Sequence, residues 1–342
     1  MSSDTIGNPF RCEEHDVGEV LADLGRYTVC VNDPPWSGLV GRVAAPVRVV
    51  QAWDMDIAHL ERVAADADDA EVVVGLGGGT ALDTAKFVAW RRGLPLVQVP
   101  TITSVDAGFT DAIGVRVDGK VRYIGKIEPR LVVLDLPLVQ SAPKRLNRAG
   151  IGDILSCHTG LYDWRLATDA GHGHPWHDGL AALGAALLDE LEAAADEVAA
   201  VSDAGVRFLA DAYRRIGAGC AWAGHSRFEE GSEHFWAYAY EHATGAHPVH
   251  GEIIAFAVCA LAHVQGNDPD RAFAIVSRSR ARAHPDDLGV AHDDFVAAVV
   301  GLADYARAES LDIGVADLRA ITAEEAERAW AFVQRLPREA GN

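Results

Sequence analysis

The feature that most constrains the fold is a glycine-rich turn between a β-rich apolar run and a helical stretch. Val72-Val73-Val74 leads into Gly75-Leu76-Gly77-Gly78-Gly79, and a helical pattern begins at Thr80. A turn of this kind can bring a pyrophosphate to the unpaired amides and the positive end of a helix dipole. Because Thr80 stands where GxGxxG has its third glycine, the turn alone leaves two interpretations open: a dinucleotide site or a tight strand-to-helix connection.

Strand-like and helix-like segments alternate through the first 150 residues. This alternation predicts an α/β domain in which a parallel sheet carries helices on its faces. An Asp118-Gly119 turn between two short alternating runs predicts an inserted hairpin, with strands at 113–117 and 121–123. The other predicted strands are 27–32, 47–51, 71–75, 94–99 and 131–135, and the predicted helices are 57–67 and 80–91.

Alanine- and leucine-rich helical patterns replace the strands after Asp135, so the second domain is expected to be all-α. We place the boundary near Ala149 and expect domains at 1–148 and 149–342. Gly150 and Gly152 would let backbone approach a site between them. The predicted helices include 180–201, 206–223 and 293–308.

Charge and composition exclude several kinds of partner. Fifty acidic residues against thirty basic ones give a formal net charge of −20, which repels nucleic acid and anionic membrane surfaces. No apolar run is long enough to span a bilayer, and the start, Met1–Asn8, does not resemble a signal peptide. Five widely spaced cysteines suit reduced thiols. We therefore expect a cytoplasmic protein without membrane insertion.

Several motifs occur in the order found in one superfamily. Gly77–Lys86 resembles the cofactor loop of iron-containing (group III) alcohol dehydrogenases and dehydroquinate synthases. Residues 100–107 resemble the proline-threonine loop of glycerol dehydrogenases, 142–153 fits the same branch, and 163–167 looks more like glycerol-1-phosphate dehydrogenase. The resemblance runs from about Gly75 to Glu252. It implies a dehydroquinate synthase-like fold, with a Rossmann-like NAD-binding domain followed by a helical metal-binding and substrate domain.

The same resemblance implies which residues bind the dinucleotide. Asp33, which closes the first predicted strand, would face the adenosine ribose and favour NAD over NADP, although NADP stays possible. A turn residue before Pro34-Pro35 is an equal alternative for Asp33. The implied cofactor-binding residues are Asp33, Gly77, Gly78, Gly79, Asp83, Thr101 and Ser104.

The resemblance also implies a metal site made by Asp153, His234 of Ser-Glu-His and His250 of His-Gly-Glu. Spacing alone would not identify it, because fourteen histidines are scattered along the chain. One carboxylate and two imidazoles suit Zn²⁺ or Fe²⁺ and leave positions open for substrate. Kinship with glycerol-1-phosphate dehydrogenase favours zinc. The rival histidines His172, His174 and His177 lie in a Gly/Pro-rich stretch that we interpret as a solvated connector.

Two departures from the family point to a different substrate. Where glycerol-1-phosphate dehydrogenases typically have Ser-Arg-Pro-Ala-Ser-Gly, this chain has Ser226-Arg227-Phe228-Glu229-Glu230-Gly231. A carboxylate about 4 Å from a substrate phosphate would cost roughly 4 kcal/mol at an effective dielectric near 20, which makes a phosphorylated substrate doubtful. The candidate substrate contacts are Asp106, Lys126, Arg227 and Glu230.

The second departure is Tyr238, which stands where many relatives carry another substrate-facing histidine. It can donate a hydrogen bond to substrate, or it can pack a core with Phe235, Trp236 and Tyr240. Asp106 corresponds to an aspartate that lies beside nicotinamide and substrate in glycerol dehydrogenases, and it can instead be a turn cap. Asp106 and Tyr238 join the three metal ligands as catalytic candidates.

These observations predict a metal-dependent NAD(H) oxidoreductase that moves a hydride to or from a small polyol or hydroxycarbonyl compound, and that assembles as a homo-oligomer. The alternative is a sugar-phosphate cyclase related to dehydroquinate synthase, which uses NAD transiently. That chemistry needs a pocket rich in lysine and arginine, and the glycine-lysine loop of the cyclases is missing here. A catalytically silent binding protein on the same fold is a third possibility.

Overall fold

The computed structural model describes residues 11–66 and 68–339, so the Met1–Asn8 segment considered above lies outside the described residues. The chain forms two compact units. One, here called the sheet unit, holds the described residues up to Pro143 together with Tyr213–Trp222. The other, here called the helical unit, holds Lys144–Ala212 and the residues from Ala223 onward.

The sheet unit is built on six parallel strands in the order β1-β8-β5-β4-β2-β3. All five strands expected in this sheet are present, which confirms the α/β prediction. The short, acidic β1 was missed because three residues, Cys-Glu-Glu, carry no apolar alternation. The strands are β1 Cys12–Glu14, β2 Tyr27–Val31, β3 Arg48–Gln51, β4 Val72–Gly77, β5 Leu96–Pro100 and β8 Leu131–Leu134.

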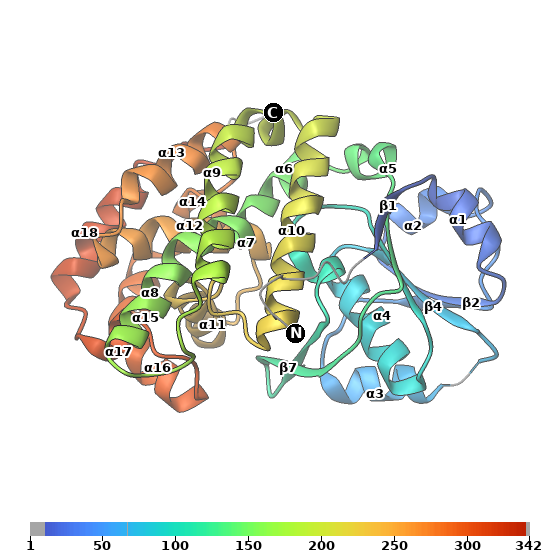
Figure 1. Cartoon of the computed structure of the whole chain (residues 1–342), viewed down its shortest axis with the longest axis horizontal. Coiled ribbons are helices and arrows are strands. Elements are labelled where there is room, and N and C mark those ends of the chain that lie inside the picture. Colours follow the sequence, from blue (N-terminus) through green and yellow to red (C-terminus); the bar gives the residue numbers. More distant parts are fainter. Residues whose placement is uncertain (1–10, 67, 340–342) are drawn as a thin grey trace. The chain divides into compact units, whose positions relative to one another are not determined.

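Helices cover both faces of the sheet, because alternate residues of each central strand point to opposite sides (Figure 1). Val74 and Leu76 of β4 belong to a core with α1 Val17–Asp23 and α2 Pro35–Leu39. Val73 belongs to the opposite core, with α3 Ile57–Ala65 and α4 Gly79–Arg92. This two-sided burial explains why the strands have nearly continuous apolar sequences.

The predicted hairpin is confirmed as a separate antiparallel sheet of β6 Ala112–Val117 and β7 Lys120–Lys126. Both turn residues have positive φ, 52° at Asp118 and 75° at Gly119, as a tight type I′ turn requires. Ile113 and Val115 pack into the same core as α3 and α4, so the hairpin belongs to that face of the sheet.

In the described residues after β8 no strand returns, as expected. The predicted helix 293–308 is wrong in one respect: it is two helices, α15 His292–Val300 and α16 Leu302–Glu309, divided at Gly301 with ψ near 0°. Glycine is a poor helix former by about 1 kcal/mol relative to alanine, which favours the break there. The other elements are η1 Asp106–Phe109, α5 Leu136–Ser141, α6 Lys144–Arg148, η2 Ala149–Ile151, α7 Gly152–Leu155, α8 Cys157–Asp169, α9 Asp178–Ala200, α10 Asp203–Ala223, α11 Ser232–Thr244, α12 His250–Gln265, α13 Pro269–Ser279, α14 Pro285–Leu288, α17 Val315–Leu318 and α18 Ala323–Val333.

Helix α12 is the centre of the helical unit, and nearly every residue after His250 in it is buried. It packs against α7, α8, α11, α13 and α18, which explains why its sequence is apolar on every side (Figure 1). Within the described part of the chain, no helix is both long and apolar enough to cross a membrane.

The close approach of α7 and α12 depends on Gly152. A Cβ at this position would lie 2.5 Å from Gly251 O and 2.7 Å from Gly251 Cα, and these backbone atoms cannot rotate away. We therefore expect Gly152→Ala to lower the free energy of unfolding by about 1–3 kcal/mol in a denaturant titration. Gly38→Ala, in helix α2 with nothing within 4 Å of the added Cβ, is the control and should leave stability unchanged or raise it by up to about 1 kcal/mol, because alanine is the better helix former. Equal stabilities would contradict the steric argument.

Candidate active site

The glycine turn joins β4 to α4, and its conformation requires glycine. Gly77 has φ of +156°, and a Cβ there would lie 2.5 Å from Asn32 Oδ1. That oxygen accepts a hydrogen bond from Gly78 N at 3.0 Å, while Asn32 Nδ2 donates to Ala52 O at 2.8 Å. Gly78 is the N-cap of α4, so the first amides of the helix, which have no intrahelical acceptor, start at the turn. Asn32 therefore fixes the turn, although the sequence pointed only to its neighbour Asp33.

Thr101 and Ser104 are buried beyond the carboxyl end of β5, beside the glycine turn. Thr101 N donates to Gly77 O at 2.9 Å, which ties the two strand ends together. Asp106 begins η1 and is half-buried. Ligands of open parallel sheets bind beyond the carboxyl ends of the strands, and these predicted residues lie there.

The other predicted residues of the sheet unit have local partners. Asp83 lies 3.1 Å from the buried Lys86 Nζ, which also donates to Ala112 O at the start of β6. Asp33 is exposed and accepts from both the backbone N (3.1 Å) and the hydroxyl (2.5 Å) of Ser37, contacts that lower the pKa of its carboxyl. The exposed Lys126 lies 3.3 Å from Asp111.

In the helical unit, Asp153, His234 and His250 meet, with one ligand atom from each within 4.8 Å of the other two. Asp153 comes from α7, His234 from the first turn of α11 and His250 from the first residue of α12. The shortest contact among them joins His250 Nε2 to Asp153 Oδ1 at 3.2 Å. Asp153 and His234 are buried, whereas the His250 side chain is 33% exposed. A carboxylate oxygen and two imidazole nitrogens gathered in this way fit a divalent metal ion.

The surroundings of His234 are strongly anionic. Burial by itself lowers the pKa of this imidazole. The Nδ1–Glu233 hydrogen bond and the charges of Glu230, Glu233 and Glu229 outweigh burial and raise the pKa to about 10. The same negative field attracts a divalent cation, which must displace the proton from the ring to bind. The electrostatics therefore agree with the donor set.

Sequence reasoning missed Asp163, a fully buried carboxylate on α8 that organises this region. Its Oδ2 accepts from Ser232 N at 2.7 Å and its Oδ1 from Val315 N at 2.8 Å, so it joins the first turns of α11 and α17. Burial raises the pKa of Asp163 to about 6 despite the hydrogen bond from Ser232 and the charge of Arg227. Its position in the Asp-Trp-Arg motif was noticed, but nothing in the sequence showed what it contacts.

Arg227 and Glu230, both predicted to bind substrate, have defined intramolecular partners. The buried Arg227 guanidinium donates to Ile313 O at 2.8 Å and to the main-chain oxygen of Glu230 at 3.1 Å. The Glu230 carboxylate accepts from Ser226 Oγ at 2.5 Å and from Tyr238 OH at 2.7 Å. The Tyr238 ring in turn lies 6.1 Å from the His234 ring, centroid to centroid. Glu230 is therefore one side chain away from His234.

The aromatic residues beside Tyr238 do pack a core. Phe235, Trp236 and Tyr240 are buried, and the Trp236 ring stacks on Tyr240 with centroids 5.3 Å apart. Tyr238 is only half-buried and bonded to Glu230, so it is distinct from that core.

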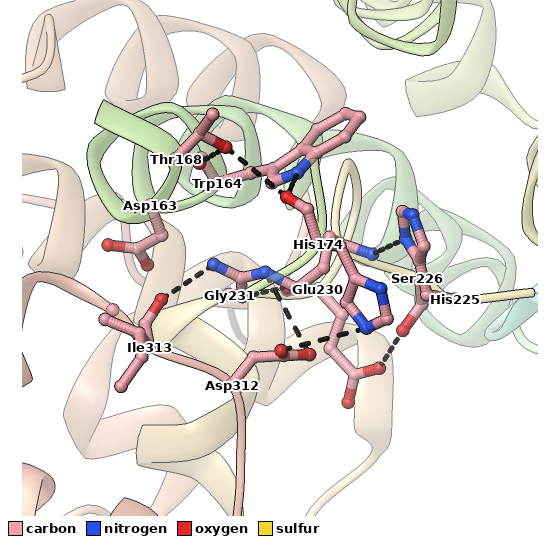
Figure 2. Close-up of polar contacts among 12 residues, drawn as sticks. Asp163, Trp164, Thr168, His174, His225, Ser226, Glu230, Gly231, Asp312 and Ile313 are labelled. Carbon is pink, nitrogen blue, oxygen red and sulfur yellow. Dashed lines mark hydrogen bonds and ion pairs between the residues drawn. The ribbon is translucent and has the colours of Figure 1, made fainter. Parts of the chain in front are cut away.

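The rival histidines do not form a metal site in the described structure. His172 and His174 are exposed in the connection between α8 and α9, as expected, and His177 caps α9 by accepting from Leu180 N. His174 stacks on His225 with ring centroids 4.1 Å apart (Figure 2).

The comparisons with known proteins agree with these two arrangements. Residues 39–143 match the model of the iron-containing alcohol dehydrogenase family. A glycerol-1-phosphate dehydrogenase (NAD(P)+) from Thermofilum pendens is 34% identical over 297 residues, covering 82% of this chain and 84% of the relative. One from Aeropyrum pernix is 30% identical over 72% of this chain and 70% of the relative. The chain belongs to the iron-containing alcohol dehydrogenase family.

Solved structures of this family share the fold. A probable glycerol dehydrogenase from Sinorhizobium meliloti 1021 has a TM-score of 0.75 at 23% identity, covering 96% of this chain and 97% of that one. A glycerol dehydrogenase from Schizosaccharomyces pombe has a TM-score of 0.72 at 15% identity, covering 96% and 90%. The resemblance inferred from the motifs is confirmed, and so is the fold class.

The stacked histidines predict a pH effect on stability. Burial and the neighbouring His174 lower the pKa of His225 to about 4, against the opposing charge of Asp312. The unfolded chain takes up this proton near pH 6.5 and the folded protein only near pH 4, so the contribution is complete above 6.5 and is lost as the pH falls to 4. We expect His225→Gln to show a smaller drop in melting temperature between pH 7.5 and 4.5 than the unmodified protein does. Equal drops would contradict this assignment.

Proposed function

We propose that the chain is a metal-dependent NAD(P)(H) oxidoreductase that transfers a hydride between nicotinamide and a small polyol or hydroxycarbonyl compound. The observation that carries the proposal is the meeting of Asp153, His234 and His250 in a family of alcohol dehydrogenases. The relatives named above are glycerol-1-phosphate and glycerol dehydrogenases, which supports a CH–OH substrate. The cyclase alternative is not favoured by these relatives.

Asp153, His234 and His250 would hold the ion, which as a Lewis acid stabilises negative charge on the substrate oxygen. The first turn of α4, with Gly77 and Gly78, would bind the pyrophosphate of the dinucleotide. Thr101, Ser104 and Asp106, beyond the same edge of the sheet, would line the nicotinamide side of the groove. Tyr238, whose hydroxyl donates to Glu230, would orient a substrate hydroxyl.

Finer features of the proposal rest on single residues or on kinship. Asp33 supports NAD over NADP, since a carboxylate there repels a 2′-phosphate, although its present bonds to Ser37 also suit a simple cap. Zinc rather than iron is the ion that we propose, on the kinship with glycerol-1-phosphate dehydrogenases alone, because the donor set suits both ions. Assembly as a homo-oligomer stays a prediction. The five cysteines are widely spaced along the chain and suit reduced thiols, which supports the reducing cytoplasm.

An unphosphorylated substrate is also part of the proposal. Arg227 is a cation within the loop at 226–231, and its guanidinium donates to two backbone carbonyls, Glu230 O and Ile313 O. The Glu230 carboxylate accepts a hydrogen bond from Tyr238 OH, and the Tyr238 ring lies 6.1 Å from the His234 ring, centroid to centroid. A phosphate near this carboxylate would be repelled, whereas a hydroxyl could donate to it.

Removing the metal should abolish hydride transfer. With glycerol, dihydroxyacetone and related polyols, we expect a net NADH change at 340 nm that chelation removes and added Zn²⁺ restores. Asp153→Ala should lower kcat/KM at least about 100-fold, because the loss of Lewis-acid stabilisation costs several kcal/mol. Asp169→Ala, an exposed carboxylate on α8, is the control. Phosphate release from an added sugar phosphate without net NADH would support a cyclase instead, and full turnover by Asp153→Ala would exclude the proposed metal site.

Glu230→Gln should relax the discrimination against phosphate. The glutamine oxygen can still accept from one of the two hydroxyl groups and its NH2 can donate to the other, while the negative charge is removed. We expect the ratio of kcat/KM for glycerol 1-phosphate to that for glycerol to rise at least about tenfold, within the roughly 4 kcal/mol that one such repulsion can cost. Glu324→Gln, on an exposed side chain, should leave the ratio unchanged. An unchanged ratio in Glu230→Gln would show that Glu230 does not face the substrate.

A further inference from the structure

We propose that Glu233 is the positioning residue of the metal site: its carboxylate accepts the Nδ1–H of His234 and holds the ring with Nε2 directed to the ion. The inference goes beyond the proposed function and rests on it only for the identity of the ligand triad. Glu233 precedes the ligand in the chain, and neither the composition nor the spacing of the motif indicated a role for it.

The contact that carries the inference is short and buried. Glu233 Oε1 lies 2.9 Å from His234 Nδ1, and both side chains are withdrawn from solvent. An imidazole has two ring nitrogens, so a proton fixed on Nδ1 by this acceptor leaves the lone pair on Nε2. A carboxylate in this position also makes the ring more basic and therefore a stronger metal ligand.

Adjacent residues in a helix do not normally face each other, because each is rotated by about 100° from the last. Here the contact forms because Glu233 lies in the first turn of α11 and bends back toward the helix start. The same Oε1 accepts from Gly231 N, the amide of the N-cap residue, at 2.7 Å. The carboxylate is thus fixed to the backbone before it meets the ring.

Two neighbouring residues, Asp163 and Gly231, fix the start of α11 around Glu233. Asp163 holds Ser232 N at 2.7 Å, which fixes the backbone between the cap and Glu233. A Cβ on Gly231 would lie 2.8 Å from Asp163 Oδ2 and 3.0 Å from Glu233 Oε2, so a larger residue would push the carboxylates away. Glycine at the cap therefore lets two buried carboxylates converge on one helix end.

Glu252 provides an internal comparison. It is as deeply buried as Glu233 and lies two residues after the ligand His250. Its carboxylate, however, lies 3.2 Å from Arg282 Nη1 and 3.8 Å from Arg145. The two motif glutamates thus have different partners, an imidazole for Glu233 and guanidinium groups for Glu252.

The test measures Zn²⁺ affinity of the metal-free full-length protein by competition with a chromophoric chelator, without any turnover. Glu233→Asp keeps the charge but shortens the side chain, so it loses the contact with Nδ1. Glu233→Gln keeps the reach and an acceptor oxygen but loses the charge. We expect Zn²⁺ binding to weaken about 10- to 100-fold in Glu233→Asp and less in Glu233→Gln, while Glu252→Gln binds like the unmodified protein.

The melting temperatures of the metal-free proteins separate positioning from folding. We expect the melting temperature of metal-free Glu233→Gln to be close to that of the unmodified metal-free protein, while its Zn²⁺ binding is weaker. Affinity in Glu233→Asp equal to that of the unmodified protein would overturn the proposal, because charge alone would then suffice. Equal affinity in Glu233→Gln would overturn the ligand-strengthening role. If the unmodified protein itself fails to bind Zn²⁺, the proposed function fails first and the inference falls with it.

Discussion

Four carboxylates are buried around the first turn of α11, and the helical unit has to compensate their negative charge. Asp153, Asp163, Glu229 and Glu233 are all withdrawn from water, and buried anions are costly unless donors or cations face them. Backbone amides supply part of this compensation, at Gly231, Ser232 and Val315. Arg227 faces Asp163, His250 contacts Asp153, and the anionic surroundings raise the pKa of His234, which favours its positive charge. A bound divalent cation would offset the same negative charge.

Two glycines of the helical unit leave the space that brings these carboxylates together. Gly152 lets α7 approach α12, which carries Asp153 toward His250, and Gly231 lets two carboxylates meet at the start of α11. Gly77 serves the sheet unit in the same way, by leaving room for Asn32 to hold the turn. At each of these three positions the absence of a Cβ lets a neighbouring backbone segment or polar side chain approach closely.

The loop at 226–231 places a carboxylate near this charged region. Glu230 is held by Ser226 and Tyr238, whose hydroxyl groups both donate to its carboxylate. The Arg227 guanidinium supports the same loop through Ile313 O and the main-chain oxygen of Glu230. The loop therefore presents a carboxylate on the Tyr238 side of His234, while its cation stabilises the backbone.

The sequence by itself determined the alternating α/β pattern, the hairpin and the helical second half. Through its ordered motifs it also determined the family and the three residues, Asp153, His234 and His250, that meet in the helical unit. These features could be predicted because they depend on local periodicity and on short patterns. Only the tertiary structure decided the partners of Arg227, the bond from Tyr238 to Glu230, the roles of Asn32 and Asp163, and the contact of Glu233 with His234. Those contacts join segments up to 152 residues apart or turn a side chain back along its own helix, and no periodicity encodes where such a side chain points.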